Sequence, residues 1–158
     1  ESCVLLMDFA ETPPQSVPGA VLEEGLPGEL WLASLAQLHG QNDHARRTHR
    51  RILENLAVPA VFAAAPLDDG SPAALAYGAV HDGIVCVNSV VTHPDFRRQG
   101  QARKAVAAVL SWAQELRGAT GACLSVVAEN APARALYESM GFTREMYRYH
   151  YRRRSAPT

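Results

Sequence analysis

Residues 90–102 read VVTHPDFRRQGQA, and they connect a predicted strand to a predicted amphipathic helix through a turn that contains glycine. A strand that passes directly into a helix leaves several main-chain N–H groups unpaired at one place, with the positive end of the helix dipole behind them. Gly100 has no side chain and Ala102 has only a methyl group, so a bulky anion can reach the main chain there. The arginines on both sides add positive charge. We therefore predict that this turn binds a pyrophosphate group.

The segments outside this turn predict a mixed α/β layout. Helical periodicity covers residues 27–40, and a second helix should begin at Asn42 or Asp43. Turn chemistry at residues 68–70 and 82–83 predicts hairpins. The remaining expected elements are strands at 3–9, 60–65, 73–81, 84–92, 122–128 and 143–151, a helix that ends at Gly118, and a helix at 130–140.

Size and charge limit the class of protein. A chain of 158 residues with 47% hydrophobic composition can bury one core, so we expect one domain. The formal net charge of -1 gives no whole-molecule attraction to nucleic acid or to an anionic membrane. The longest apolar run, residues 57–66, is about half of the roughly twenty residues that span a bilayer. We expect neither nucleic acid nor membrane as a partner.

The three cysteines, Cys3, Cys86 and Cys123, are an odd number at wide spacing, which argues against a disulfide framework. Cys86 and Cys123 lie within apolar runs that predict strands, so we expect buried thiols in a reduced, cytoplasmic protein. Thiols in the middle of strands are also poorly placed to act as covalent nucleophiles. No group of cysteines or histidines has the spacing of metal ligands, and we predict no metal site.

Two blocks of sequence resemble a known family. Residues 90–102 resemble the acetyl-CoA-binding signature of the GCN5-related N-acetyltransferases (GNAT). Residues 130–142, NAPARALYESMGF, resemble the second conserved block of that family at a comparable distance downstream. The resemblance implies a GNAT-like acyl-CoA N-acyltransferase fold. Its central sheet would be mixed, mostly antiparallel and splayed at the cofactor site, with helices on both faces.

The resemblance also implies that acetyl-CoA is the cofactor, and it assigns binding residues. The strand that carries Ser89 would bend away from its neighbour at 124–127, and the cofactor would fill the wedge. Val90, Val91 and Thr92 would offer main-chain groups to the pantetheine arm and the acetyl carbonyl. The pyrophosphate would be held by Arg97, Arg98, Gln99, Gly100, Gln101, Ala102 and Arg103. Asn130 is a good N-cap for the next helix, and the resemblance implies that it also contacts the cofactor arm.

Tyr137 is the predicted catalytic residue, and it would also contact the cofactor. Its position matches the family tyrosine near the cofactor sulfur. A phenol with a reference pKa of about 10 can donate a proton or a hydrogen bond as the thiolate leaves. The alternative is a packing role as a core aromatic residue. We expect direct transfer of the acetyl group to an amine, without a covalent enzyme intermediate.

The identity of the general base stays open. Many relatives place a glutamate on one of the two splayed strands, but residues 87–89 and 125–127 contain no carboxylate here. Glu129, His81 or His93 could act through a chain of water molecules, or the amine could arrive already neutral. The sequence selects none of these.

One strand of the family pattern is missing after the second block, because a single strand at 143–151 is followed by a short basic tail. Residues 3–9 have the length and composition to fill that edge of the sheet, from the same or a neighbouring subunit.

Taken with the resemblance, residues 1–158 should form a single GNAT acetyltransferase domain. Its parts would be a strand and loop at 1–25, acceptor-side helices and meander at 26–83, the acetyl-CoA-binding core at 84–142, and a final strand and tail at 143–158. The expected reaction acetylates the primary amine of a small molecule. The alternatives are a peptide or protein N-terminal amine as acceptor, or a non-catalytic coenzyme-A-binding sensor. A homodimer is left open.

Overall fold

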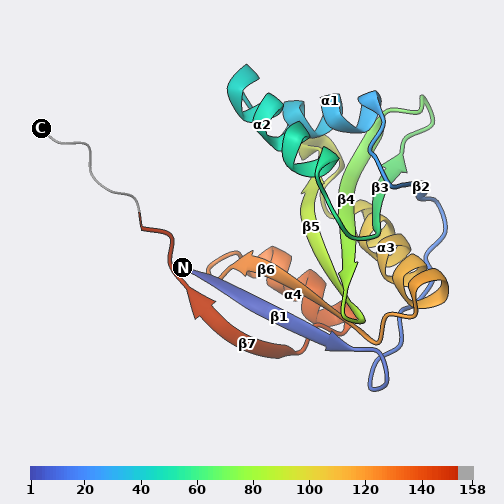
Figure 1. Cartoon of the computed structure of the whole chain (residues 1–158), viewed down its shortest axis with the longest axis vertical. Coiled ribbons are helices and arrows are strands. Elements are labelled where there is room, and N and C mark those ends of the chain that lie inside the picture. Colours follow the sequence, from blue (N-terminus) through green and yellow to red (C-terminus); the bar gives the residue numbers. More distant parts are fainter. Residues whose placement is uncertain (153–158) are drawn as a thin grey trace, which may run out of the picture.

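The computed structural model describes residues 1–152 of the chain. Their strands form one seven-stranded sheet in the order β2-β3-β4-β5-β6-β1-β7 (Figure 1). The elements are β1 (Ser2–Asp8), β2 (Val21–Glu24), α1 (Glu29–Leu38), α2 (Asp43–Glu54), β3 (Ala60–Pro66), β4 (Pro72–His81), β5 (Ile84–Thr92), the 3-10 helix η1 (Pro94–Phe96), α3 (Gln101–Arg117), β6 (Gly121–Val127), α4 (Ala131–Met140) and β7 (Arg144–Tyr149). Among the described strand pairs only β5 and β6 run parallel. The expected mixed, mostly antiparallel fold is confirmed, while the tail after residue 152 lies outside the described residues.

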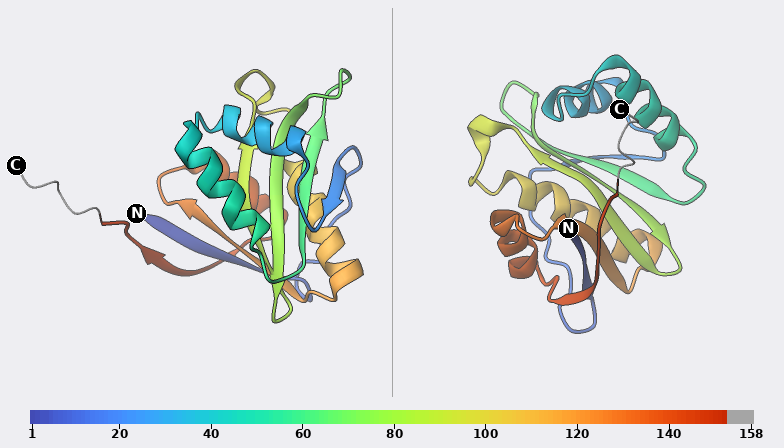
Figure 2. Two further views of the ribbon diagram at one scale, coloured as in Figure 1. Left: turned by 45° about the horizontal axis from the view of Figure 1, so that its top comes forward. Right: turned by 90° about the vertical axis from the view of Figure 1, so that its left-hand side faces the viewer.

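Helices cover both faces of the sheet, as expected. Helices α1 and α2 lie on one face, and α3 and α4 lie on the other (Figure 2). Each face has its own apolar cluster. One contains Val106, Val109 and Phe142 on the α3 and α4 side, and the other contains Trp31 and Phe62 on the α1 side. No helix in the part of the chain that the structure describes is long and apolar enough to cross a membrane.

Local chemistry explains where most elements begin and end. Helix α2 starts at Asn42, whose side chain accepts a hydrogen bond from the Ala45 N–H at 2.9 Å. In the turn between β4 and β5, Asp82 and Gly83 have φ values of 48° and 75°, which suits a tight type I′ hairpin. The helices and strands expected from the sequence are confirmed, with small shifts at their ends.

Strand β1 joins the sheet, but not at its edge. It lies between β6 and β7 and is antiparallel to both, with Leu5 opposite Leu124 of β6 and Glu145 of β7. The expectation that residues 3–9 complete the sheet is confirmed, and their placement at the edge is wrong. The physical reason is burial: Leu5 and Met7 on one face of β1 are buried, so the strand suits an interior position. Strand β7 is exposed along nearly its whole length and carries charged residues, which suit an edge strand.

The sheet opens between β5 and β6. Their parallel pairing covers only Ile84–Val87 on β5 and Gly121–Leu124 on β6. Just beyond, Ser89 has a positive φ of 52°, and the register between β4 and β5 shifts. An extra residue on one strand bends it and ends regular pairing. The bend and splay expected around Ser89 are therefore confirmed.

Gly78 lets α3 pack closely on β4. A Cβ atom at this position would overlap Cγ1 of Val109 and would lie 2.8 Å from Cγ2 of Val85.

We predict that Gly78→Ala lowers the free energy of unfolding by about 1–3 kcal/mol, because overpacking displaces well-packed neighbours. Urea denaturation measures this loss. The control is Gly78→Ala in a Val109→Ala background, where the overlap is relieved and the added cost of Gly78→Ala should shrink. Equal costs in both backgrounds would contradict the packing argument.

Candidate active site

A cleft of about 590 Å³ lies where β5 parts from β6, between the N-terminal ends of α3 and α4. Its lining residues are Val90, Val91, Thr92, Arg97, Arg98, Gly100, Gln101, Ala102, Arg103, Asn130, Pro132, Ala133, Leu136 and Tyr137. The structure thus brings together every predicted cofactor-binding residue except Gln99. The side chain of Gln99 instead donates to the main-chain carbonyl of Asp95 at 3.4 Å. A contact from the main chain of Gln99 stays a prediction.

The N-terminus of α3 has no side-chain cap among the described residues. Gly100 occupies the N-cap position with a φ of 77°, and no side-chain hydrogen bond satisfies the first turn. A Cβ added to Gly100 would meet nothing within 4 Å, so the space in front of it is open. Helices α2 and α4 differ, because Asn42 and Asn130 cap them. The first N–H groups of α3 are therefore available to an anion in the cleft.

The charges around α3 also favour an anion. No acidic residue lies in its first turn, whereas the uncapped helix α1 carries Glu29 there, and the carboxylate of Glu23 accepts from the Gly28 N–H at 2.6 Å. Helix α1 thus already has protein carboxylates at its positive end. The α3 end has Arg97 and Arg98 in the cleft lining instead.

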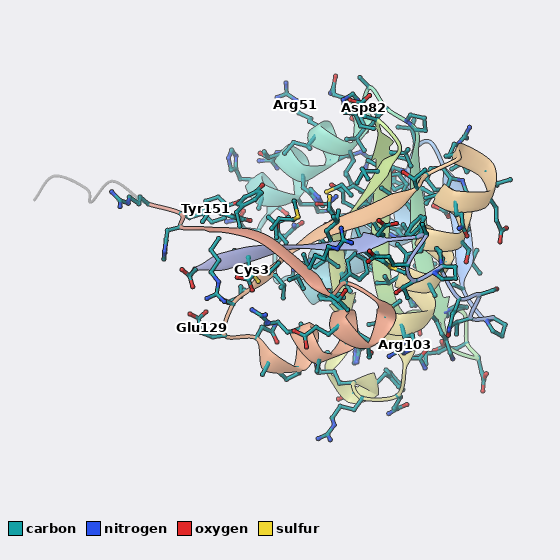
Figure 3. All side chains as sticks on the ribbon, turned by 90° about the horizontal axis from the view of Figure 1, so that it is seen from below. Cys3, Arg51, Asp82, Arg103, Glu129 and Tyr151 are labelled. Atoms are coloured by element: carbon teal, nitrogen blue, oxygen red, sulfur yellow. The ribbon has the colours of Figure 1, made fainter. Side chains whose placement is uncertain are left out.

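Arg103 links the two sides of the cleft. Its Nη2 donates to Oγ of Ser139 on α4 at 2.5 Å, and Ser139 in turn donates to the Leu136 carbonyl. Figure 3 shows Arg103 beside α4 and Arg51 on the far side of the molecule, on α2. The arginines of α2 therefore take no part in this cleft.

The cleft offers further polar groups that fit acetyl-CoA. The buried Oε1 atom of Gln101 accepts no hydrogen bond from any residue that the structure describes, so it can accept one from a ligand. Beyond Val87, β5 has no register partner on β6. Main-chain groups of Val90 to Thr92 can therefore face a ligand on that side. Open space at Gly100, unpaired amides and adjacent arginines match the pyrophosphate of the cofactor, and the open strand matches its extended amide-containing arm.

Tyr137 lies on the inner side of α4 and lines the cleft. It is 7% exposed, and its ring packs edge-on against Phe142 with centroids 6.0 Å apart. Burial raises the pKa of Tyr137 to about 12, because a phenolate loses its hydration there. Its hydroxyl therefore stays protonated at neutral pH. Tyr137 both packs against Phe142 and lines the cleft, so its packing role does not exclude a catalytic role.

Asn130 fills the expected cap position. Its side-chain oxygen accepts from the Ala133 N–H at 3.3 Å. This hydrogen bond occupies the oxygen, while Asn130 also lines the cleft. The N-cap expectation is confirmed, and contact with the cofactor arm stays a prediction.

The three candidate bases do not line the cleft. His81 lies at the β4–β5 hairpin, opposite Ile84, and is separated from Val90 by six residues of strand, roughly 20 Å. It is too far away to act. Nδ1 of His93 accepts from the Asp95 N–H at 3.2 Å. Glu129 is exposed at the turn before α4 (Figure 3). The geometry therefore removes His81 and leaves the base unassigned.

Sequence reasoning missed three lining residues, Pro132, Ala133 and Leu136. All three lie on α4 within one helical turn or so of Tyr137. Leu136 follows Pro132 by four residues and Ala133 by three, a spacing that places the three on the same side of the helix, and this periodicity could have identified them.

The expectation of buried thiols at Cys86 and Cys123 is wrong for Cys86 and holds only in part for Cys123. Cys3 is buried, Cys123 is half-buried and Cys86 is exposed. Side chains alternate along a strand, and Val85 and Val87 take the face of β5 that packs on α3. Cys86 therefore points to the opposite face, which is the face that carries α1 and α2.

Comparisons with known proteins agree with this geometry. The model of the acetyltransferase (GNAT) family matches residues 29–142. No curated protein matches the sequence at a significant level.

Several solved structures share the fold. A tandem GNAT protein from the clavulanic acid biosynthesis pathway superposes with a TM-score of 0.75 at 16% identity, over 89% of this chain and 49% of that chain. An aminoglycoside N-acetyltransferase in complex with CoA gives a TM-score of 0.62 at 20% identity, over 89% of this chain and 99% of that chain. The ribosomal-protein-S18-alanine N-acetyltransferase from Escherichia coli gives 0.58 at 23% identity, over 77% of both chains. This chain spans 49%, 59% and 52% of three longer matched structures, about half of their length.

The family model covers the open strand β5, the turn at Gly100 and all of α4, so it includes each part of the cleft. This chain therefore belongs to the GNAT family of acetyl-CoA-dependent acetyltransferases.

Proposed function

We propose that this domain transfers the acetyl group of acetyl-CoA directly to the primary amine of a small molecule. The observation that carries the proposal is the uncapped N-terminus of α3, which opens into a cleft that contains a buried, protonated tyrosine. Acetyl-CoA supplies an activated acetyl thioester. The protein must then hold the anionic end, orient the thioester and provide a proton for the departing thiolate.

Binding is assigned to two parts of the cleft. The N–H groups at the start of α3, with Arg97 and Arg98, hold the pyrophosphate. The main chain of β5 from Val90 to Thr92 holds the extended arm, because β6 has left that edge unpaired.

Tyr137 is assigned the role of proton donor to the departing thiolate. Its hydroxyl lies in the cleft lining and is kept protonated by burial, so it can donate to a thiolate at neutral pH. No exposed group competes for this role within the cleft lining, because the other ionisable side chains there are arginines, which do not give up a proton at this pH.

The acceptor is assigned to small-molecule amines because an aminoglycoside acetyltransferase matches over nearly its whole length. A peptide N-terminal amine is the second candidate, supported by the match to a ribosomal-protein alanine acetyltransferase. Cytoplasmic location stays a prediction, and a homodimer stays open.

The proposal predicts amine-dependent release of free coenzyme A from acetyl-CoA. The experiment incubates the protein with acetyl-CoA and a panel of small polyamines, aminoglycosides and short peptides, and measures free coenzyme A by chromatography. Release with a small-molecule amine supports the proposal, and release with peptides alone favours the second candidate. Binding of acetyl-CoA in calorimetry without any amine-dependent release indicates a sensor, and no binding at millimolar concentration refutes the proposal.

Gly100→Ala should weaken acetyl-CoA binding about 10- to 100-fold, because the new methyl group fills the open space and strains the left-handed residue. Hydrogen bonds to charged groups are worth about 1.5–3 kcal/mol each, which sets this range. Gly118→Ala is the matched control. Gly118 also has a positive φ, 64°, with nothing within 4 Å of an added Cβ, but it ends α3 far from the cleft. Both variants should lose similar stability, and only Gly100→Ala should lose affinity in calorimetry.

Tyr137→Phe should lower turnover by about 10- to 1000-fold, since the proton donor is removed while the packed ring stays. Affinity for acetyl-CoA should change little. Tyr147→Phe on the exposed strand β7 serves as the control for loss of a hydroxyl. Because the raised pKa keeps the hydroxyl protonated above the usual tyrosine value, wild-type turnover should show no loss from this group up to about pH 10. If Tyr137→Phe turned over substrate as fast as the wild-type protein, Tyr137 would not be the proton donor.

A further inference from the structure

Cys86 and Cys123 are register partners across the parallel strands β5 and β6. Neighbouring strands lie about 4.8 Å apart, which falls in the usual range of roughly 4.4–6.8 Å between the Cα atoms of a disulfide. Both side chains point to the same face of the sheet, because Val85 and Val87 on β5, and Ala122 and Leu124 on β6, fill the other face. The two side chains are therefore neighbours on this face of the sheet.

The position of this pair matters for the site. Pairing of β5 with β6 ends one residue further on, at Val87 and Leu124, so the two thiols lie at the root of the opening. They are on the face that carries α1 and α2, opposite the cleft between α3 and α4. A molecule that reaches the opening from that face passes these sulfur atoms.

The surroundings of the two thiols favour a thiolate at Cys86. Cys86 is exposed, and Cys123 is half-buried. Hydrogen bonding from the Cys123 thiol lowers the pKa of Cys86 to about 6, with a further contribution from Asn88. The same interaction raises the pKa of Cys123. One thiolate next to one thiol is the arrangement in which an oxidised cysteine is captured by its neighbour.

We propose that Cys86 and Cys123 are an oxidation site, at which hydrogen peroxide converts the two thiols to a disulfide that ties β5 to β6 at the root of the opening. The Cys86 thiolate attacks a peroxide oxygen, so that an S–O bond forms, the O–O bond breaks and hydroxide leaves. Cys123 sulfur then attacks the Cys86 sulfenic acid, the S–S bond forms and the S–O bond breaks. The thiol proton and one from solvent complete two molecules of water. The net change is two thiols and one peroxide to one disulfide and two waters.

The consequence for activity rests on the proposed function. The disulfide fixes the spacing of the two strands and removes the thiolate from the face that carries α1 and α2, which is the side predicted from the sequence to hold the amine acceptor. Oxidation should therefore lower the turnover of the amine, with a smaller effect on the affinity for acetyl-CoA, which binds from the other face. Reduction by dithiothreitol should restore turnover.

The test treats the protein with hydrogen peroxide, blocks free thiols with an alkylating reagent and maps the peptides by mass spectrometry. The expected result is a peptide pair joined through Cys86 and Cys123, with Cys3 left out because it is buried. In Cys123→Ser, Cys86 should stop at the sulfenic acid and be trapped by dimedone. Two free thiols after peroxide, or Cys86 linked between two chains, would overturn the proposal. This readout needs no acetyl transfer, so it does not depend on the proposed function.

A second arm measures free coenzyme A release before and after peroxide. Wild-type protein should lose at least several-fold in turnover and recover it with dithiothreitol, whereas Cys86→Ser should keep the rate that it had before peroxide. If the disulfide forms in an active protein and turnover stays unchanged, the predicted effect of oxidation on turnover of the amine is refuted.

Discussion

The parting of β5 from β6 is the constraint on which the site depends. Parallel pairing holds from Ile84 to Val87, and the left-handed residue Ser89 then adds a residue that β4 does not match. Regular pairing with β6 does not continue past this point. Main-chain groups from Val90 onward therefore face a cleft instead of a neighbouring strand. If the strands had stayed paired, these hydrogen bonds would have been used within the sheet, and no ligand could lie between α3 and α4.

The helix ends show why charge alone does not locate an anion site. Arginines are as frequent on α2 as near α3, but Arg50 is paired with Glu29 and Glu54, and α2 is capped by Asn42. At α3 the first turn lacks both a side-chain cap and a carboxylate, and it opens into the cleft. Unpaired N–H groups at a helix end attract an anion most strongly where nothing in the protein has already satisfied them.

Most of the fold follows from local sequence, and the exception is the position of β1 in the sheet. Turn residues, caps and apolar periodicity depend on neighbours a few positions apart, so the strands around Asp82 and the helices after Asn42 and Asn130 were predictable. The place of β1 was not, because it depends on pairing with β6 and β7, more than a hundred residues away along the chain. The lining residue Leu136 was within reach of helical periodicity. The distance of His81 from the cleft was also within reach, because the hairpin predicted at residues 82–83 already places His81 at the far end of β5 from Val90.

Local sequence is enough to predict the turn at Gly100, because a strand, a glycine and a helix in succession leave main-chain N–H groups without a partner inside the helix. It also determined the caps and the order of the elements. Two features could be known only from the three-dimensional fold: Tyr137 is buried in the wall of the cleft, and Cys86 is exposed beside Cys123. Both outcomes depend on which strand lies next to which and in what register. Register comes from packing across the whole sheet, and a shift of one residue would turn each side chain to the other face.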